Sequence, residues 1–198
     1  MSRVTCDISI SLDGHGAGLN QRADAPFGDG LENEDLHRWM FHEADRHTEE
    51  LAAITAAGAF VMGRNMFSPG RGAWDLNWTG WWGSEPPYHA PVFVLTHHDR
   101  DSVAMDGGTT FHFVTGGAEE ALRRARAAAG DRDVAIAGGP ATINQYLAAG
   151  ALDELRLHVV PLVLGQGARL FEGVGRTDLR LVSSRCTPLV SHLTYAKV

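Results

Sequence analysis

The sequence predicts an α/β protein with a mostly parallel, mixed central sheet and helices on both faces of that sheet. Two observations support this prediction. Short apolar runs alternate with segments of helical pattern along most of the chain, which is typical of parallel strands joined by helices. The last segment, 179–198, alternates apolar and polar residues on both sides of Thr187-Pro188 and so predicts a C-terminal antiparallel hairpin.

The individual elements follow from these apolar patterns and from the glycines that end them. Strands are expected at 4–10, 59–62, 91–96, 109–115 and 134–137, and a sixth begins near Asp153. Helices are expected at 34–57, 116–130 and 140–149. No internal repeat or linker divides the 198 residues, so we expect a single domain, 1–198, with an insertion at 68–90 that holds four of the five tryptophans.

Composition and charge limit the kinds of partner. The net charge of −7 argues against a nucleic-acid surface. No apolar run approaches the roughly 20 residues that span a bilayer, and the N-terminal segment lacks the pattern of a signal peptide. The two cysteines, Cys6 and Cys186, suit a reducing compartment. We therefore expect a cytoplasmic protein with a small-molecule substrate and without nucleic-acid or membrane partners.

Two adjacent glycines, Gly138 and Gly139, stand between a predicted strand and the helix that begins at Pro140. The first-turn N–H groups of such a helix, together with the positive end of its dipole, favour a phosphate at the end of the sheet. The missing Cβ of Gly139, and backbone angles closed to other residues, are the expected reasons for glycine at this position. A tight turn without a ligand is the alternative.

Two further junctions follow predicted strands. At Gly63-Arg64-Asn65 a guanidinium offers a planar fork for phosphate oxygens, although a surface arginine is the alternative. At Thr96-His97-His98 a hydroxyl and two imidazoles follow another strand. Ligands of open α/β sheets bind at the carboxyl ends of strands, so all three junctions are candidates for one site. The Rossmann fingerprint G-x-G-x-x-G is absent, so a dinucleotide would be held in another way.

One carboxylate, Asp13, ends the first strand beside the glycine-rich loop SLDGHGAG. A carboxylate in that position is a candidate to supply or relay a proton. Because Asp-Gly pairs favour turns, a turn residue is the alternative.

The ten histidines form no familiar metal motif. His42 and His47 are five residues apart, or about 140° around a helix, whereas the zinc-protease motif places both ligands on one helix face. No cluster of cysteine and histidine supplements them, so we expect no metal site. Nucleophilic hydrolysis also lacks support, since no G-x-S-x-G elbow is present.

Five stretches occur in an order that spans nearly the whole chain: SLDGxxAG, VMGRNMF, VFVLTHH, AGGPATINQYL and DELRLHVVPLVLGQGARLF. Together they resemble the reductase domain of bacterial riboflavin-biosynthesis deaminase-reductases, in a stand-alone branch without the zinc deaminase motif. The resemblance implies a dihydrofolate reductase-like, three-layer fold, NADPH as cofactor and a homodimer.

The resemblance also implies roles for the candidate residues. Ala17 and Gly18 would lie by the nicotinamide, and Gly63-Arg64-Asn65 would lie at the phosphates and the adenosine end. Thr96-His97-His98 would hold the adenosine 2′-phosphate, where the family often offers a serine or threonine. The pyrophosphate would lie against Gly138, Gly139, Pro140, Ala141 and Thr142.

Ala137 stands where the riboflavin-pathway enzymes have a glutamate, so substrate identity does not transfer with the resemblance. The predicted function is NADPH-dependent hydride transfer to a small heterocyclic or carbonyl-like substrate, similar to a pterin or a pyrimidine. A nucleotide-binding module without catalytic activity is the alternative. The tryptophan-rich insertion would line the substrate pocket or form a dimer contact.

Overall fold

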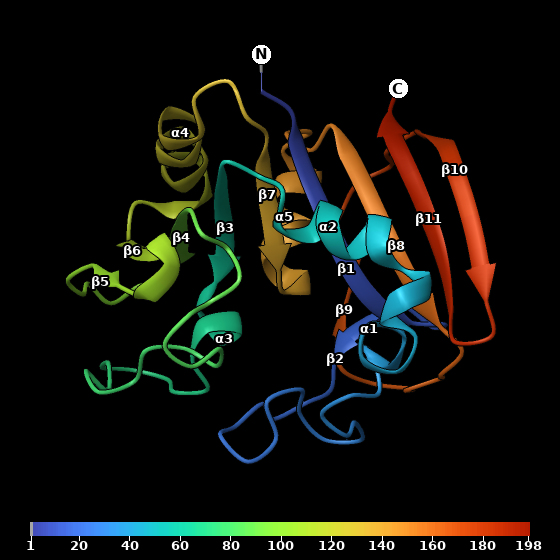
Figure 1. Ribbon diagram of the computed structural model, residues 1–198, viewed down its shortest axis with the longest axis horizontal. Helices are drawn as coiled ribbons and strands as arrows, with labels where there is room; N and C mark the ends of the chain where they lie inside the picture. Colours follow the sequence, from blue (N-terminus) through green and yellow to red (C-terminus); the bar gives the residue numbers. More distant parts are fainter. Residues whose placement is uncertain (1) are drawn as a thin grey trace.

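A nine-stranded sheet runs through the centre of the computed structural model, which describes residues 2–198 (Figure 1). In spatial order its strands are β10 (Leu179–Thr187), β11 (Val190–Lys197), β8 (Glu154–Val160), β1 (Val4–Ser11), β7 (Val134–Gly138), β3 (Ala59–Gly63), β4 (Pro91–Leu95), β6 (Thr110–Val114) and β5 (Val103–Ala104). A second, two-stranded sheet pairs β2 (His15–Ala17) with β9 (Ala168–Arg169).

The strands from β8 to β6 in this order are parallel to their neighbours. β11, β10 and β5 are antiparallel and lie toward the two edges. The predicted mostly parallel sheet with a C-terminal hairpin is therefore confirmed. The central strands β3 and β7 are apolar and almost entirely buried, as expected for parallel strands that are covered on both faces.

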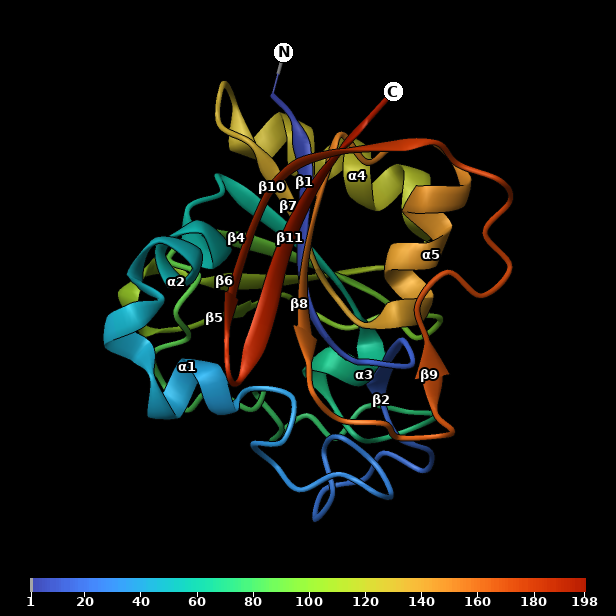
Figure 2. The ribbon, with the colours of Figure 1, turned by 90° about the vertical axis from the view of Figure 1, so that its right-hand side faces the viewer.

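Helices cover both faces of the sheet (Figure 2). α4 (Gly117–Ala129) and α5 (Pro140–Ala148) lie on one face, and α1 (Arg38–His42) and α2 (Thr48–Thr55) lie on the other. The remaining helical segments are α3 (Arg64–Phe67) and two 3₁₀ turns, Ala44–Arg46 and Asp106–Gly108. Among the described residues, no helix has both the length and the apolar character needed to cross a bilayer.

The prediction of one helix over 34–57 is wrong. The backbone leaves the helical conformation at Glu43 and His47, where φ is −133° and −124°. A continuous helix would separate Trp39 and His47 by about 12 Å along its axis. In the structure their rings lie 5.2 Å apart, and both side chains are fully buried against the sheet. Tertiary packing of these two rings therefore overrides the local helical preference.

The tryptophan-rich insertion, 68–90, contains neither helix nor strand. Trp74, Trp78 and Trp82 are half-buried against the apolar cluster around Phe67 and Phe111. The Trp78 indole also donates a hydrogen bond to the Phe67 carbonyl at 2.7 Å. These tryptophans complete the hydrophobic core beside α3.

Candidate functional site

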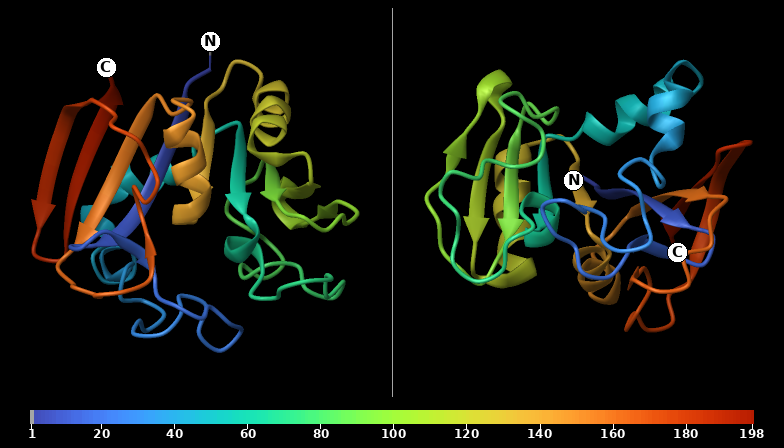
Figure 3. Two further views of the ribbon diagram at one scale, coloured as in Figure 1. Left: turned by 180° about the vertical axis from the view of Figure 1, so that it is seen from behind. Right: turned by 90° about the horizontal axis from the view of Figure 1, so that it is seen from below.

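The carboxyl ends of β7, β3 and β4 lie side by side, because these three strands are neighbours in the sheet. They lead into Gly138-Gly139, Gly63-Arg64 and Thr96. The right-hand view of Figure 3 looks at this edge of the molecule. The structure thus brings the three predicted junctions together.

The first turn of α5 leaves backbone donors free. Thr142 and Ile143 donate their N–H groups to the Gly139 carbonyl at 3.0 and 3.1 Å. The N–H groups of Gly139 and Ala141 have no hydrogen-bond partner within residues 2–198. Free donors at the positive end of a helix suit an anion.

Gly139 faces open space, since a Cβ built on it would meet no atom within 4 Å. Its φ of −80° and ψ of −170° are extended angles that any residue adopts, so the expected need for special angles at Gly139 is wrong. The left-handed φ belongs to Gly138, at +134°, and the peptide between the two glycines is cis. The backbone conformation at Gly139 therefore does not require glycine, and the space beside its Cα is open.

Two other glycines bring neighbouring segments against this turn. A Cβ on Gly16, in β2, would lie 2.7 Å from Cγ of Pro140. A Cβ on Gly63, at the end of β3, would collide with the Thr142 hydroxyl. These close approaches surround the first turn of α5 with the ends of two strands.

Arg64 follows Gly63, but its guanidinium turns toward the tryptophan-rich insertion. It donates to the carbonyls of Gly72 at 2.6 Å and Ala73 at 3.4 Å, and it lies 3.9 Å above the Trp74 ring. Burial lowers the pKa of Arg64 from its ordinary value. Its Nε is buried and has no hydrogen-bond partner in the described chain. In this structure Arg64 holds the insertion, and its contact with a phosphate stays a prediction.

The Thr96 hydroxyl likewise forms a hydrogen bond within its own turn. It accepts the His98 N–H at 3.1 Å, and the His98 carbonyl accepts the Trp74 indole N–H at 2.8 Å. The side chains of His97 and His98 are exposed. Thr96-His97-His98 therefore stands at the predicted edge with two imidazoles available to a ligand.

Asp13 accepts three hydrogen bonds that stabilise its anionic form, and one imidazole nitrogen lies nearby. The Ser11 hydroxyl donates at 2.6 Å, the Leu164 and Gly165 N–H groups donate at 3.0 and 2.7 Å, and His15 Nδ1 lies 3.3 Å away. The Ser11 hydrogen bond, reinforced by the two backbone donors, holds the pKa of Asp13 well below its usual range. This geometry favours the turn interpretation over a proton donor.

The remaining predicted residues lie in two different settings. Ala17 is buried at the end of β2, and Gly18 packs so closely against the Asp29 carbonyl that a Cβ would overlap it. The Gly18 N–H donates to the Phe27 carbonyl at 2.7 Å. Asn65 is exposed on α3.

A comparison with known protein families shows which family this chain matches. Residues 2–192 match the family model described as the RibD C-terminal domain. The chain belongs to the RibD C-terminal domain family. The predicted resemblance is thereby confirmed.

Solved structures similar to this RibD C-terminal domain share its fold at low identity. A riboflavin biosynthesis protein of Shewanella sp. PV-4 superposes with a TM-score of 0.65 at 21% identity, over 99% of both chains. Dihydrofolate reductase of Enterococcus faecalis, solved with NADP(H), gives 0.60 at 14% identity, over 98% of this chain and 96% of its own. These likenesses confirm the dihydrofolate reductase-like fold.

Two further relatives are matched over part of their length. The Thermotoga maritima diaminohydroxyphosphoribosylaminopyrimidine deaminase/5-amino-6-(5-phosphoribosylamino)uracil reductase gives a TM-score of 0.58 at 13% identity, over all of this chain and 57% of that one. The uncharacterized YyaP of Bacillus subtilis (strain 168) is 30% identical over 95 residues, which are 48% of this chain and 46% of YyaP.

Gly16 and Trp74 were not among the predicted site residues. Gly16 lies in the quoted loop SLDGHGAG, but the sequence does not indicate which of its glycines meets a helix. Trp74 holds both Arg64 and the turn after β4, and its position in the irregular segment 68–90 carries no local pattern.

We expect Asp13→Asn to destabilise the protein at neutral pH, because the amide is a weaker acceptor for the Ser11, Leu164 and Gly165 donors. The contribution of a carboxylate with a depressed pKa is present above its unfolded pKa of about 4 and is lost as the pH falls further. Urea midpoints of wild type and variant should therefore differ at pH 7, and the difference should shrink progressively as the pH falls below about 4.

The exposed Asp45 provides the matched control, since Asp45→Asn should leave the urea midpoint unchanged. Equal midpoints for wild type and Asp13→Asn at pH 7, together with a loss of turnover, would instead assign Asp13 a role in proton transfer.

Proposed function

We propose that this RibD C-terminal domain is an NADPH-dependent reductase that transfers a hydride to a small heterocycle similar to a pyrimidine or a pterin. The observation that carries the proposal is the first turn of α5, where the N–H groups of Gly139 and Ala141 are free and Gly139 faces open space. A diphosphate is the anion that this turn would accept most readily in a family whose relatives include reductases.

The residues at the sheet edge fit a nicotinamide dinucleotide. Gly139 and Ala141 would donate N–H groups to the diphosphate, with Pro140 and Thr142 completing the turn. The exposed His97 and His98, and the Arg64 guanidinium after a small rotation, would meet the adenosine end with its 2′-phosphate. When bound, the nicotinamide supplies the hydride. Ala17 and Gly18 would limit the space beside its ring.

The proposed substrate class rests on similar proteins and on one position at which this chain differs from the riboflavin-pathway enzymes. The Thermotoga maritima relative is a uracil-derivative reductase, and a Corynebacterium diphtheriae protein of the same fold is described as pyrimidine reductase-like. Ala137 replaces the glutamate expected in riboflavin-pathway enzymes, so we propose the class of planar heterocycle and not the pathway intermediate. Asp13, held as an anion, is a poor source of the proton that completes a reduction.

Binding and turnover test the proposal directly. Tryptophan fluorescence is expected to fall on titration with NADPH, and absorbance at the nicotinamide band should fall when a pyrimidine or pterin is added. Absence of NADPH and NADH binding in the micromolar range would overturn the proposal. Tight NADPH binding without turnover on pyrimidines, pterins or quinones would indicate the nucleotide-binding module.

We expect Gly139→Ala to weaken NADPH binding about tenfold or more, which corresponds to about 1.4 kcal/mol. The new methyl group would occupy the space in front of the free N–H groups, while the extended φ and the absence of protein neighbours leave the fold intact. Fluorescence titration and the thermal midpoint Tm, measured on the same preparation, test this. Arg64 is a less decisive position because it also holds the insertion.

Two glycines serve as controls for this variant. Gly175→Ala, at another open position with ordinary φ, should change neither affinity nor Tm. Gly63→Ala should lower Tm, since its Cβ would collide with Thr142. Unchanged NADPH affinity in a folded Gly139→Ala protein would contradict the diphosphate assignment.

We also propose that the protein is a homodimer joined through β10. This strand ends the sheet, is exposed along its length, and presents Leu181 and Val182 with half of their surface accessible. An unpaired edge of this kind favours association with a second strand. The apolar residues of β8 and β11 pack largely against the chain's own core, so they are less available for such a contact.

Light scattering should then give about twice the chain mass of 21.4 kDa, and Leu181→Lys should reduce it to one chain. Leu76→Lys, at an even more exposed leucine of the insertion, is the control and should leave the dimer intact. A dimer that responds to Leu76→Lys alone would place the contact on the insertion, and a wild-type mass of one chain would contradict the proposal.

A further inference from the structure

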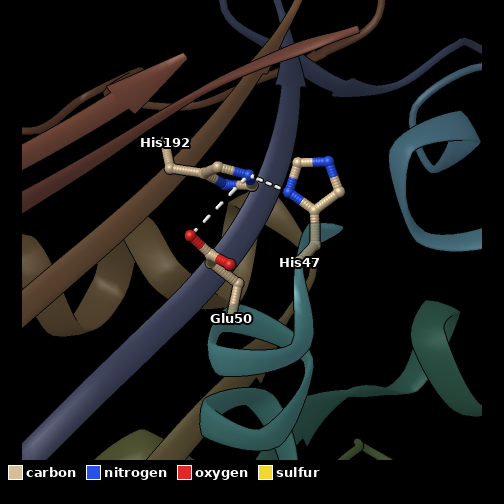
Figure 4. A group of neighbouring side chains, drawn as sticks. All are labelled: His47, Glu50 and His192. Atoms are coloured by element: carbon tan, nitrogen blue, oxygen red, sulfur yellow. Dashed lines mark hydrogen bonds and ion pairs between the residues drawn. The ribbon is translucent and has the colours of Figure 1, made fainter. Parts of the chain in front are cut away.

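A cluster of histidines lies on the face of the sheet that α1 and α2 cover, away from the α5 turn. Arg185, His192, His158 and Ser9 are direct cross-strand neighbours on β10, β11, β8 and β1. His47 lies just before α2 and Glu50 lies in its first turn, and both meet His192 (Figure 4). His47, His158 and His192 are buried. Four strands and the start of α2 thus bring three imidazoles and a carboxylate together.

Two ring nitrogens and one carboxylate converge on one point. His47 Nδ1 and His192 Nε2 are 2.9 Å apart, and Glu50 Oε1 lies 4.0 Å from the same His192 nitrogen. The Arg185 guanidinium reaches this point from the edge strand. Its Nη2 lies 2.9 Å from His47 Nδ1 and 2.6 Å from Glu50 Oε2. The positively charged guanidinium of Arg185 therefore contacts both His47 and Glu50.

His47, His192, His158 and Asp7 form a row of hydrogen-bonding groups. With the guanidinium in place and every imidazole neutral, this row cannot form all of its hydrogen bonds. Arg185 only donates, so His47 Nδ1 carries no proton. His192 Nε2 must then donate to that nitrogen, which leaves His192 Nδ1 to accept from His158 Nδ1 at 2.7 Å. His158 Nε2 is consequently bare, and it faces the carboxylate oxygen Oδ1 of Asp7 at 3.5 Å. Both of these buried atoms have no hydrogen-bond partner within the described residues.

A metal ion in place of the guanidinium would reverse the donors along His192 and His158 and would remove the mismatch at Asp7. His47 Nδ1 and His192 Nε2 would both offer lone pairs to the ion. His192 Nδ1–H would then donate to His158 Nδ1, and His158 Nε2–H would face Asp7. The second nitrogen of His47 would carry its proton toward Glu43 Oε2, 3.6 Å away. Each imidazole is then neutral, and a carboxylate stands at each end of the row.

We propose that His47, Glu50 and His192 bind a divalent transition-metal ion of the zinc class. Two imidazoles and one carboxylate are the ligands such ions prefer, with water free to complete the coordination. Ligand atoms of a tetrahedral zinc ion are about 3.3 Å apart. The present separations of 2.9 and 4.0 Å lie on either side of that value, so small side-chain shifts suffice.

The ion would replace the Arg185 guanidinium and link the start of α2 to the sheet. The Arg185 side chain is 43% exposed and belongs to the edge strand, so it can turn outward into solvent. His47 and Glu50 belong to the segment 34–57, and His192 belongs to β11. A bond to both would stabilise the interrupted helical segment. The sequence predicted no metal site, and this proposal departs from that prediction.

Metal titration of the full-length protein tests the proposal independently of NADPH. After treatment with EDTA and its removal, the protein is titrated with Zn²⁺ by calorimetry and with Co²⁺ by visible absorption. We expect one ion per chain, Co²⁺ bands typical of four- or five-coordinate sites, and a higher Tm with Zn²⁺. His192→Gln should abolish all three effects, and His97→Gln, at an exposed histidine, should leave them unchanged.

Arg185→Ala distinguishes a metal site from a structural ion pair. If the guanidinium competes with the ion, its removal should tighten Zn²⁺ binding about fivefold, as expected from loss of a partly exposed ion pair. Circular dichroism verifies that each variant is folded. If His192→Gln does not fold, Arg185→Ala still tests the proposal. Unchanged Co²⁺ spectra in His192→Gln, weaker binding in Arg185→Ala, or no binding by wild type would overturn the proposal.

Discussion

The approach of α5 to the ends of β2 and β3 is the constraint on which the candidate site depends. Gly16 touches Pro140 and Gly63 touches Thr142, at separations that leave no room for a Cβ. These contacts hold the first turn of α5 between two strand ends at the carboxyl edge of the sheet. Within residues 2–198 the N–H groups of Gly139 and Ala141 have no partner there, and the space beside Gly139 is open.

The loops around this edge are held by hydrogen bonds to backbone atoms. Asp13 binds the N–H groups of Leu164 and Gly165, which ties the end of β1 to the segment after β8. Arg64 and Trp74 connect the end of β3, the insertion and the turn after β4. Asp13 and Arg64, which the sequence offered as candidates for chemistry or ligand binding, therefore hold the loops around this edge in place.

The two faces of the sheet differ in chemistry. The face beneath α4 and α5 is apolar, whereas the face beneath α1 and α2 buries Asp7, His158 and His192. Buried polar groups require partners, because an unpaired one loses its hydration without compensation. The position of the segment 34–57 is therefore specified by a network of polar contacts in addition to its apolar residues, and Trp39 contributes to both through its ring and its bond to Ser9.

The sequence by itself predicted the longer strands, the helices α4 and α5, and the three strand-to-loop junctions, because apolar period and glycine position are local signals. It missed the short strands β2, β5 and β9, which have two or three residues each and so carry no apolar period. The direction of the Arg64 and Thr96 side chains was decided only by the tertiary structure, since their partners lie in the irregular insertion. The same holds for the break at His47 and for its meeting with His192, which are 145 residues apart. The periodicity of a helix relates residues within that one helix. It carries no information on which side chains the folded sheet brings together from distant parts of the sequence.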